Sequence, residues 1–137
     1  MVHQREWNFG THHVWLEPPD VLWTKIKGET THQDAVTLLE IYRELGSKRP
    51  IFVVTDLSES TSVDLKARDH VAWNLRMKWF RGAVYIGAGL VQRAVASSMS
   101  FLQSLTGKQA PPTAFVSTEE EARAFIARER ALQDQVG

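Results

Sequence analysis

The sequence predicts an α/β fold with a mixed, largely parallel sheet. Two observations predict it. Short apolar runs rich in β-branched residues alternate with longer segments whose apolar residues recur every three or four positions, the periods of buried strands and amphipathic helices. Strands that alternate with helices are joined by crossovers, which leave neighbouring strands parallel. The predicted order is β-β-α-β-α-β-α-β-α.

The first two strands are expected to form an antiparallel hairpin. The segments HHVWLE and VLWTKIKG, within residues 6–28, flank Pro18-Pro19-Asp20, a strong turn signal. Apolar and polar residues alternate in the second segment, so the hairpin should have one wetter face.

A helix is expected next, beginning at Thr31 and ending at Gly46. Thr31 stands three residues before Asp34, which is the spacing of a capping box, and Gly46 is expected just after the helix end. The apolar residues between them fall on one stripe at helical spacing: Ala35, Leu38, Leu39, Tyr42 and Leu45.

The rest of the chain repeats strand and helix. IFVVTDL is a continuous apolar run, typical of a central strand buried on both faces, and GAVYIGA and PTAFVS are expected as two further buried strands. Helices are predicted over about 63–80 and 89–106. The last helix is expected to begin at Ser117, with Glu120 in the capping-box position.

Bulk composition narrows the class of protein. The 137 residues are expected to form a single domain, 1–137, with loosely ordered ends at 1–5 and 131–137. Sixteen basic residues balance sixteen acidic ones, so nucleic acid is not expected as a partner. The chain shows no apolar leader, no run long enough to span a membrane and no cysteine, which together predict a cytoplasmic protein.

The element order, with VVTDLSES at the end of the third strand, resembles the SpoIIAA-like family, the STAS/SEC14-type domains of bacteria. The resemblance spans about residues 7–130. It implies a mixed sheet of four or five strands with helices packed mainly on one face. It also implies a non-enzymatic role, because STAS domains act as anti-sigma-factor antagonists or regulatory modules, whereas SEC14-like relatives bind lipids. A regulatory, protein-binding module is therefore expected, and the alternative is a carrier of a small apolar ligand or lipid.

The chain departs from the family at the start of the second helix. Where the antagonists carry Asp-Ser-Ser-Gly or Asp-Ser-Thr-Gly, this chain has Asp64-Leu65-Lys66-Ala67. Four hydroxyl residues just upstream are candidates for a displaced phosphorylation site or loop switch: Ser58, Ser60, Thr61 and Ser62. A phosphate there would gain from the free N–H groups of the helix start. In the other interpretation, one of the four caps the helix and the rest are solvated.

A second candidate lies in GAGLVQ. Gly87 and Gly89 match the first two glycines of a dinucleotide-binding fingerprint, but the third position is Gln92. Together with Asp56, at the end of the IFVVTDL strand, they make a weak candidate turn for a ligand or phosphate. Alternatively, the glycines only shape a tight turn, and Asp56 anchors its own loop through backbone N–H groups.

No constellation of residues predicts an enzyme, a metal site or a bound cofactor. The five histidines are dispersed without a His-x-x-x-His spacing, and there is no cysteine to complete a zinc site. The sequence also lacks a Gly-x-Ser-x-Gly elbow. Non-catalytic binding is therefore the expected function.

The helix predicted over 63–80 carries apolar residues on two sides. Its sheet-facing stripe is expected to be Val71, Ala72, Leu75 and Trp79. Trp73, Met77 and Phe80 fall on nearly the opposite side, where a surface helix should be polar. These three are the candidate interface, expected to join two copies as a homodimer. The alternative is that this second stripe packs on the flank of the helix predicted at 89–106.

Overall fold

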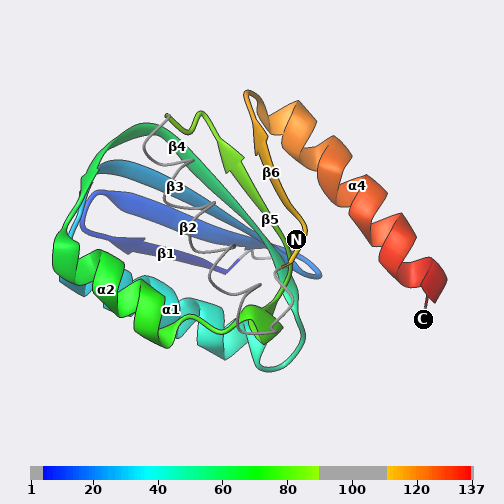
Figure 1. Cartoon of the computed structure of the whole chain (residues 1–137), viewed down its shortest axis with the longest axis horizontal. Helices are drawn as coiled ribbons and strands as arrows, with labels where there is room; N and C mark the ends of the chain where they lie inside the picture. The colour runs from blue at the N-terminus through cyan, green and yellow to red at the C-terminus, as the bar shows by residue number, and fades with distance from the viewer. Residues whose placement is uncertain (1–4, 90–110, 137) are drawn as a thin grey trace.

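The computed structural model describes residues 5–89 and 111–136, within which six strands form one sheet in the order β1-β2-β3-β4-β5-β6 (Figure 1). The strands are β1 (Glu6–Phe9), β2 (His12–Glu17), β3 (Val21–Thr30), β4 (Ile51–Val63), β5 (Phe80–Ile86) and β6 (Thr113–Val116). The helices are α1 (His32–Gly46), α2 (Leu65–Asn74) and α4 (Glu119–Val136), with a 3-10 turn, η1, at Met77–Trp79. The helix predicted over 89–106 lies outside the described residues, apart from its first position.

Strand pairing confirms the predicted mixed, largely parallel sheet. β1 with β2 and β2 with β3 are antiparallel, whereas β3 with β4, β4 with β5 and β5 with β6 are parallel. The β2–β3 hairpin is the one predicted around the Pro18-Pro19-Asp20 turn. The sheet has one strand more than predicted, because the segment Glu6–Phe9 pairs with β2 as a strand of its own.

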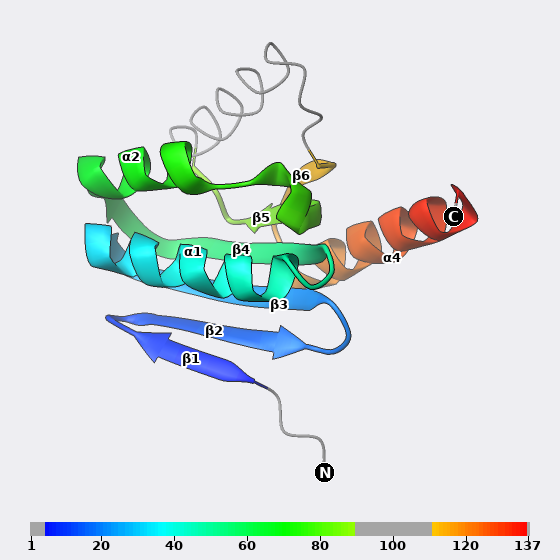
Figure 2. The same ribbon diagram turned by 90° about the horizontal axis from the view of Figure 1, so that it is seen from below.

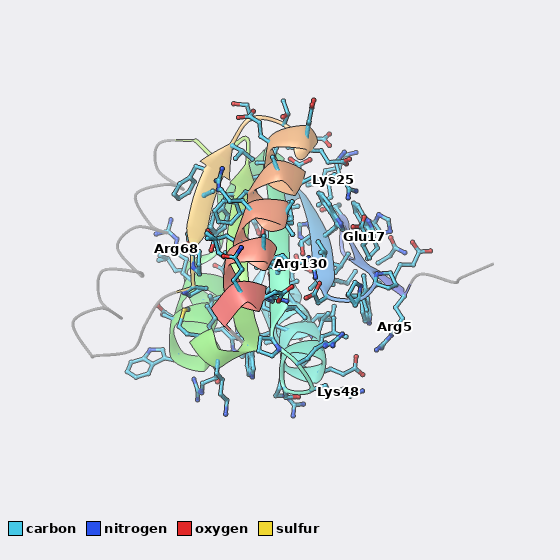
Figure 3. All side chains as sticks on the ribbon, turned by 90° about the vertical axis from the view of Figure 1, so that its right-hand side faces the viewer. Arg5, Glu17, Lys25, Lys48, Arg68 and Arg130 are labelled. Atoms are coloured by element: carbon cyan, nitrogen blue, oxygen red, sulfur yellow. The ribbon has the colours of Figure 1, made fainter. Side chains whose placement is uncertain are left out.

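The two faces of the sheet bury separate cores. Successive residues of β4 point to opposite faces, Val53 into one core and Val54 into the other. Tyr42 of α1 packs in the first core, on the side where α1 and α2 lie (Figure 2). Phe125 of α4 packs in the second, and α4 crosses the sheet on that side (Figure 3). Two of the three described helices therefore share one face, as predicted.

Helix α1 begins as predicted and ends differently. The Asp34 N–H donates to the Thr31 hydroxyl at 3.1 Å, and the Thr31 N–H donates to the Asp34 carboxylate at 3.0 Å, which completes the capping box. The prediction that Gly46 follows the helix end is wrong, because Gly46 is the last residue of α1 and is buried. Glycine suits this position because there is no room for a side chain: a Cβ would lie 2.4 Å from the Cβ of Trp79.

The helix predicted over 63–80 is shorter than expected. α2 stops at Asn74, and Leu75 takes up extended backbone. Of the stripe predicted to face the sheet, Trp79 is buried, but it projects from η1, and Ala72 is exposed. Packing of Trp79 against the end of α1 holds the chain in a turn at this point.

Near the C-terminus, two predictions are also wrong: the cap of α4 and the burial of β6. The cap of α4 is Thr118, not Ser117: the Glu121 N–H donates to the Thr118 hydroxyl at 3.1 Å, and the Glu121 carboxylate accepts the Ser117 N–H at 3.3 Å. α4 continues to Val136, so the end expected to be loose is helical up to that residue. β6 is an edge strand of the described sheet, and its residues are half-buried or exposed. None of the described helices is long and apolar enough to cross a membrane.

Candidate functional site

The hydroxyl residues predicted as a loop switch lie in strand β4. This strand continues to Val63, and β3 pairs with it as far as Thr30. Ser60 lies opposite Gly28 and is half-buried, and its Oγ makes no hydrogen bond within the described residues. The other three are exposed: Ser58, Thr61 and Ser62. The prediction of a loop is therefore wrong, while phosphorylation of the exposed hydroxyls stays a prediction.

The start of α2 is not capped by any of these four hydroxyls. Its N-cap residue is Asp64, whose side chain makes no capping hydrogen bond and whose N–H donates to the Thr30 carbonyl at 3.0 Å. Leu65, where the resemblance places a serine, is 69% exposed. This helix start therefore presents an exposed apolar side chain between two charged residues, Asp64 and Lys66.

The structure brings Asp56 and Ser58, in the middle of β4, close to Gly87, which directly follows β5. Asp56 Oδ1 accepts the Ser58 N–H at 3.0 Å and the Ser58 hydroxyl at 2.7 Å. Gly87 has a φ of 68°, which favours glycine, and its N–H donates to the Val116 carbonyl at 3.0 Å. Because Asp56 already accepts two hydrogen bonds from Ser58, and the Gly87 N–H is already bonded to β6, the geometry favours a structural turn over a phosphate site. Gly89 is exposed and ends the first described range.

The three residues of the predicted interface do not form one surface. Trp73 is 80% exposed on α2. Met77 is half-buried in η1, and Phe80 lies in β5, where its ring packs edge-on against Tyr42 with 5.1 Å between ring centroids. The prediction fails because the helix ends before Met77, so the chain turns these two side chains inward. The large exposed apolar residues of α2 are instead Leu65 and Trp73.

Met77 and Phe80 line a cavity bounded by α1, α2, η1 and strands β4 and β5. Its volume is about 200 Å³, and none of the described residues that line it carries a formal charge. The wall is formed by apolar side chains and a few hydroxyl groups, among them Leu38, Tyr42, Val53, Thr55, Leu75 and Tyr85. Local sequence patterns do not predict this cavity, because its lining residues come from separate elements that only the fold brings together.

Two tyrosines line the cavity, and burial keeps both neutral. Burial raises the pKa of Tyr85. Burial and the nearby Tyr85 also raise the pKa of Tyr42, and the hydroxyls of Thr24 and Thr55 oppose that rise only in part. Both phenols therefore remain protonated at neutral pH, so they can form hydrogen bonds but cannot serve as bases.

A histidine–aspartate pair that the sequence did not predict joins β2 to α1. His12 is buried, with its Nε2 3.0 Å from Asp34 Oδ2, and its Nδ1 accepts the Lys27 N–H at 3.1 Å. Since Nδ1 accepts, the neutral ring carries its proton on Nε2 and donates it to Asp34. Neither ring nitrogen is free to take a proton from a substrate, so the pair is structural.

Among the described residues, features suited to binding are easier to identify than a set of groups suited to catalysis. Within residues 5–89 and 111–136, no three histidine, aspartate or glutamate side chains are arranged to hold a metal ion. The two features with binding character are the exposed apolar residues of α2 and the cavity behind that helix.

Comparison with known proteins supports the fold. No family model and no curated protein matches the chain. The unphosphorylated anti-sigma factor antagonist SpoIIAA matches with a TM-score of 0.63 and 13% identity, over 85% of this chain and 98% of that one. An uncharacterised protein of the DUF3478 family with a SpoIIAA-like fold, from Shewanella loihica PV-4, matches with a TM-score of 0.61 and 20% identity, over 87% of this chain and 98% of that one. The predicted SpoIIAA-like fold is thereby confirmed.

Proposed function

We propose that the chain is a non-catalytic regulatory module that binds a protein partner, and that the outer side of α2 is its contact surface. The observation that carries this proposal is the exposure of Trp73, which is 80% accessible to solvent. Leu65, on the same helix, is 69% exposed. The likeness to SpoIIAA, an anti-sigma factor antagonist, supports a role of this class. Because fold alone does not determine function, the proposal rests on the residues of this surface.

The apolar side of α2 suits a protein contact. Seven residues, about two helical turns, separate Leu65 from Ala72, so these two lie along one side. Trp73 lies about 80° further round the helix than Leu65, with the exposed Asp69 between them. Leaving a large apolar side chain in water forgoes about 1.5–3 kcal/mol relative to burying it. Tryptophan is also enriched among the residues that dominate binding energy at protein interfaces.

The partner that we propose is a second copy of the chain. A net charge of +0 sets up no general repulsion between copies. A two-fold interface is self-complementary, so two α2 helices that meet across the axis would cover both apolar surfaces at once. Lys66 and Asp69, exposed on the same helix, carry opposite charges that such an axis can pair.

Sedimentation velocity of the whole chain at micromolar concentration tests this proposal. The double variant Leu65→Lys with Trp73→Glu places charge on the contact surface, and should weaken dimerisation at least about tenfold while the protein stays folded. The matched control is Leu132→Lys, which charges an apolar residue of α4 that is 52% exposed. The control should remain a dimer like the wild type. A monomeric wild type, or a dimer that survives the double variant, contradicts the proposal.

Two features support the proposed absence of catalysis and of the family's phosphorylation switch. Both nitrogens of the buried His12 are occupied, as described above. The first turn of α2 reads Leu65-Lys66-Ala67 after the cap residue, so no hydroxyl stands there to accept a phosphate. Regulation by this chain would therefore depend on its binding surfaces.

A second candidate function is binding of a small apolar ligand. The specific observation in its favour is the cavity of about 200 Å³ beneath α2, whose described lining residues carry no formal charge. Binding of this kind needs no catalytic group, and it is compatible with partner binding because the cavity and Trp73 lie on different sides of α2.

A further inference from the structure

We infer, resting on the second candidate function, that the cavity between α1, α2 and the sheet binds one uncharged small molecule of about two fused rings. This assigns a size and a charge to the small apolar ligand of that candidate function. Three properties of the wall lead to it: volume, charge and the position of hydroxyl groups.

The volume sets the size of the ligand. The cavity measures about 200 Å³. An apolar protein cavity of about 150 Å³ stays dry and takes up benzene. A cavity of this size therefore suits a compound somewhat larger than benzene, such as two fused rings. A lipid with two acyl chains is several times larger than this volume.

The wall sets the charge of the ligand. Val53 and Ala83 form the floor on the sheet side, and Leu38 of α1 and Leu75 at the end of α2 face them across the cavity. None of the described lining residues could pair with an ionic group. Burying a charge without a partner costs far more than burying an uncharged ring, so an anion or cation should be rejected.

The hydroxyl groups indicate where a polar substituent of the ligand would lie. Thr55 of β4 and Tyr85 of β5 are neighbours in the parallel register and both line the cavity. Burial raises the pKa of Tyr85, so its phenol is a hydrogen-bond donor rather than a charged group. An uncharged ligand with one hydroxyl or carbonyl group at its edge can hydrogen-bond to Thr55 or Tyr85. Its rings would then fill the apolar part of the cavity.

Binding in this cavity would also steady α2. Only Ala67 is buried among the ten residues of this helix, so little buried surface attaches α2 to the rest of the domain. Val71, on the inner side of the same helix, lines the cavity and would gain contacts from a ligand. The ligand should therefore slow backbone hydrogen exchange in α2.

The test uses a matched pair of probes, 2-naphthol and 2-naphthoate, which share the same rings but differ in charge at pH 7. Isothermal titration of the whole chain should show one site for 2-naphthol. The carboxylate should bind at least about thirtyfold more weakly, because its charge would be buried without a partner. Failure of 2-naphthol to bind, or equal affinity for the two probes, overturns the inference.

Variants locate the binding. Ala83→Leu fills the cavity from the floor and Val71→Phe fills it from α2, so each should abolish 2-naphthol binding, and the second guards against misfolding of the first. Trp73→Glu lies on the outer side of α2 and should leave 2-naphthol binding unchanged while it disrupts the dimer. Naphthol binding that survives both filled cavities overturns the inference. Loss of the dimer alone, or its absence in the wild type, bears only on the outer surface of α2.

Discussion

The carboxylate of Asp34 holds three segments of the chain together. It accepts the N–H of Thr31 at the start of α1 and the ring proton of His12 in β2, and His12 in turn accepts the N–H of Lys27 in β3. Burial raises the pKa of Asp34, but the hydrogen bonds from Thr31 and His12 outweigh it, and the pKa of the carboxyl is lowered from its usual value of 3.8. The folded state therefore favours the ionised form.

This lowered pKa predicts an acid-dependent contribution to stability. A carboxyl whose pKa is lower in the folded state than in the unfolded state stabilises the fold at pH values above its unfolded pKa, and loses that contribution as the pH falls through its folded pKa. The free energy of unfolding of the wild type should exceed that of Asp34→Ala at about pH 5, and the excess should shrink towards about pH 2.

Urea denaturation across this pH range measures the effect, with Glu40→Ala, an exposed carboxylate of α1, as the control. The control should follow the wild type at every pH. An Asp34→Ala deficit that stays constant down to about pH 2 would show that the carboxylate charge contributes nothing.

The Thr31–Asp34 half of this arrangement could be predicted from the sequence. Thr31 and Asp34 are three residues apart, so the capping box could be predicted from local spacing, and the structure confirms it. His12 lies 22 residues before Asp34, and only the pairing of β2 with β3 brings it to the start of α1. Contacts of this kind depend on topology, which local patterns do not contain.

Among the elements, α2 and the segment after it depart furthest from the prediction. No glycine or proline breaks the apolar pattern between 63 and 80, so periodicity alone continues the helix. In the structure the helix ends at Asn74, and Trp79 packs against the end of α1. A tertiary contact therefore overrides local propensity here.

Gly46→Ala tests that contact. In a helix, alanine is favoured over glycine by about 1 kcal/mol, so propensity alone predicts a more stable protein. The structure predicts the opposite, because the new Cβ would lie 2.4 Å from the Cβ of Trp79 and 2.9 Å from its Cα. Overpacking should lower the free energy of unfolding by about 1–3 kcal/mol.

Chemical denaturation midpoints measure this change, with the exposed neighbour Ser47→Ala as the control. The control should shift the free energy of unfolding by no more than about 0.5 kcal/mol. A stabilised Gly46→Ala protein would show that the end of α1 and Trp79 are not in contact.

Strand β4 shows which part of an element the sequence could predict. Its buried half, IFVVTDL, was evident as a continuous apolar run, and residues 51–54 are buried as expected. Its second half, around Ser60 and Thr61, looked like a loop because serine is uncommon in strands. Pairing with the long strand β3 extends it, and that pairing is invisible in the local sequence.

Across the whole molecule, Asp20 ties the β2–β3 turn to β5 and α4. Its carboxylate, only 4% exposed, accepts from Arg81 Nη1 at 3.0 Å and from Arg130 Nη2 at 2.7 Å. Both guanidinium groups also lie over the ring of Phe52, with 4.7 Å and 5.3 Å to its centroid. Arg130 projects from α4 (Figure 3), so these contacts help to hold that helix across the sheet.

Asp20→Ala should therefore weaken the attachment of α4. Removing one partner of a buried ion pair costs about 3–5 kcal/mol, and because both arginines keep some contact with solvent we expect about 2–3 kcal/mol here. The control is Glu17→Ala, which removes the carboxylate bound by Arg123 of α4 at 2.9 Å but is 33% exposed, and should cost about 1 kcal/mol or less. Equal losses for the two variants, measured by thermal or chemical unfolding, would contradict the assignment.

The arrangement of the whole molecule gives α2 two roles. Its outer side carries Trp73 and Leu65, and its inner side, with Val71, closes the cavity over the sheet. With one buried residue of its own, α2 is the described helix whose position depends most on what binds on either side. Partner binding and ligand binding would therefore use opposite sides of the same helix.

The most direct test of the proposed contact surface is hydrogen exchange of backbone amides, recorded for the wild type at low and high protein concentration. If two copies meet through α2, exchange between Leu65 and Asn74 should slow as concentration rises, whereas exchange in α4 should not change. The double variant Leu65→Lys with Trp73→Glu should show no such slowing. Association of the wild type with unchanged exchange in α2, or protection confined to another element, would contradict a contact surface on this helix.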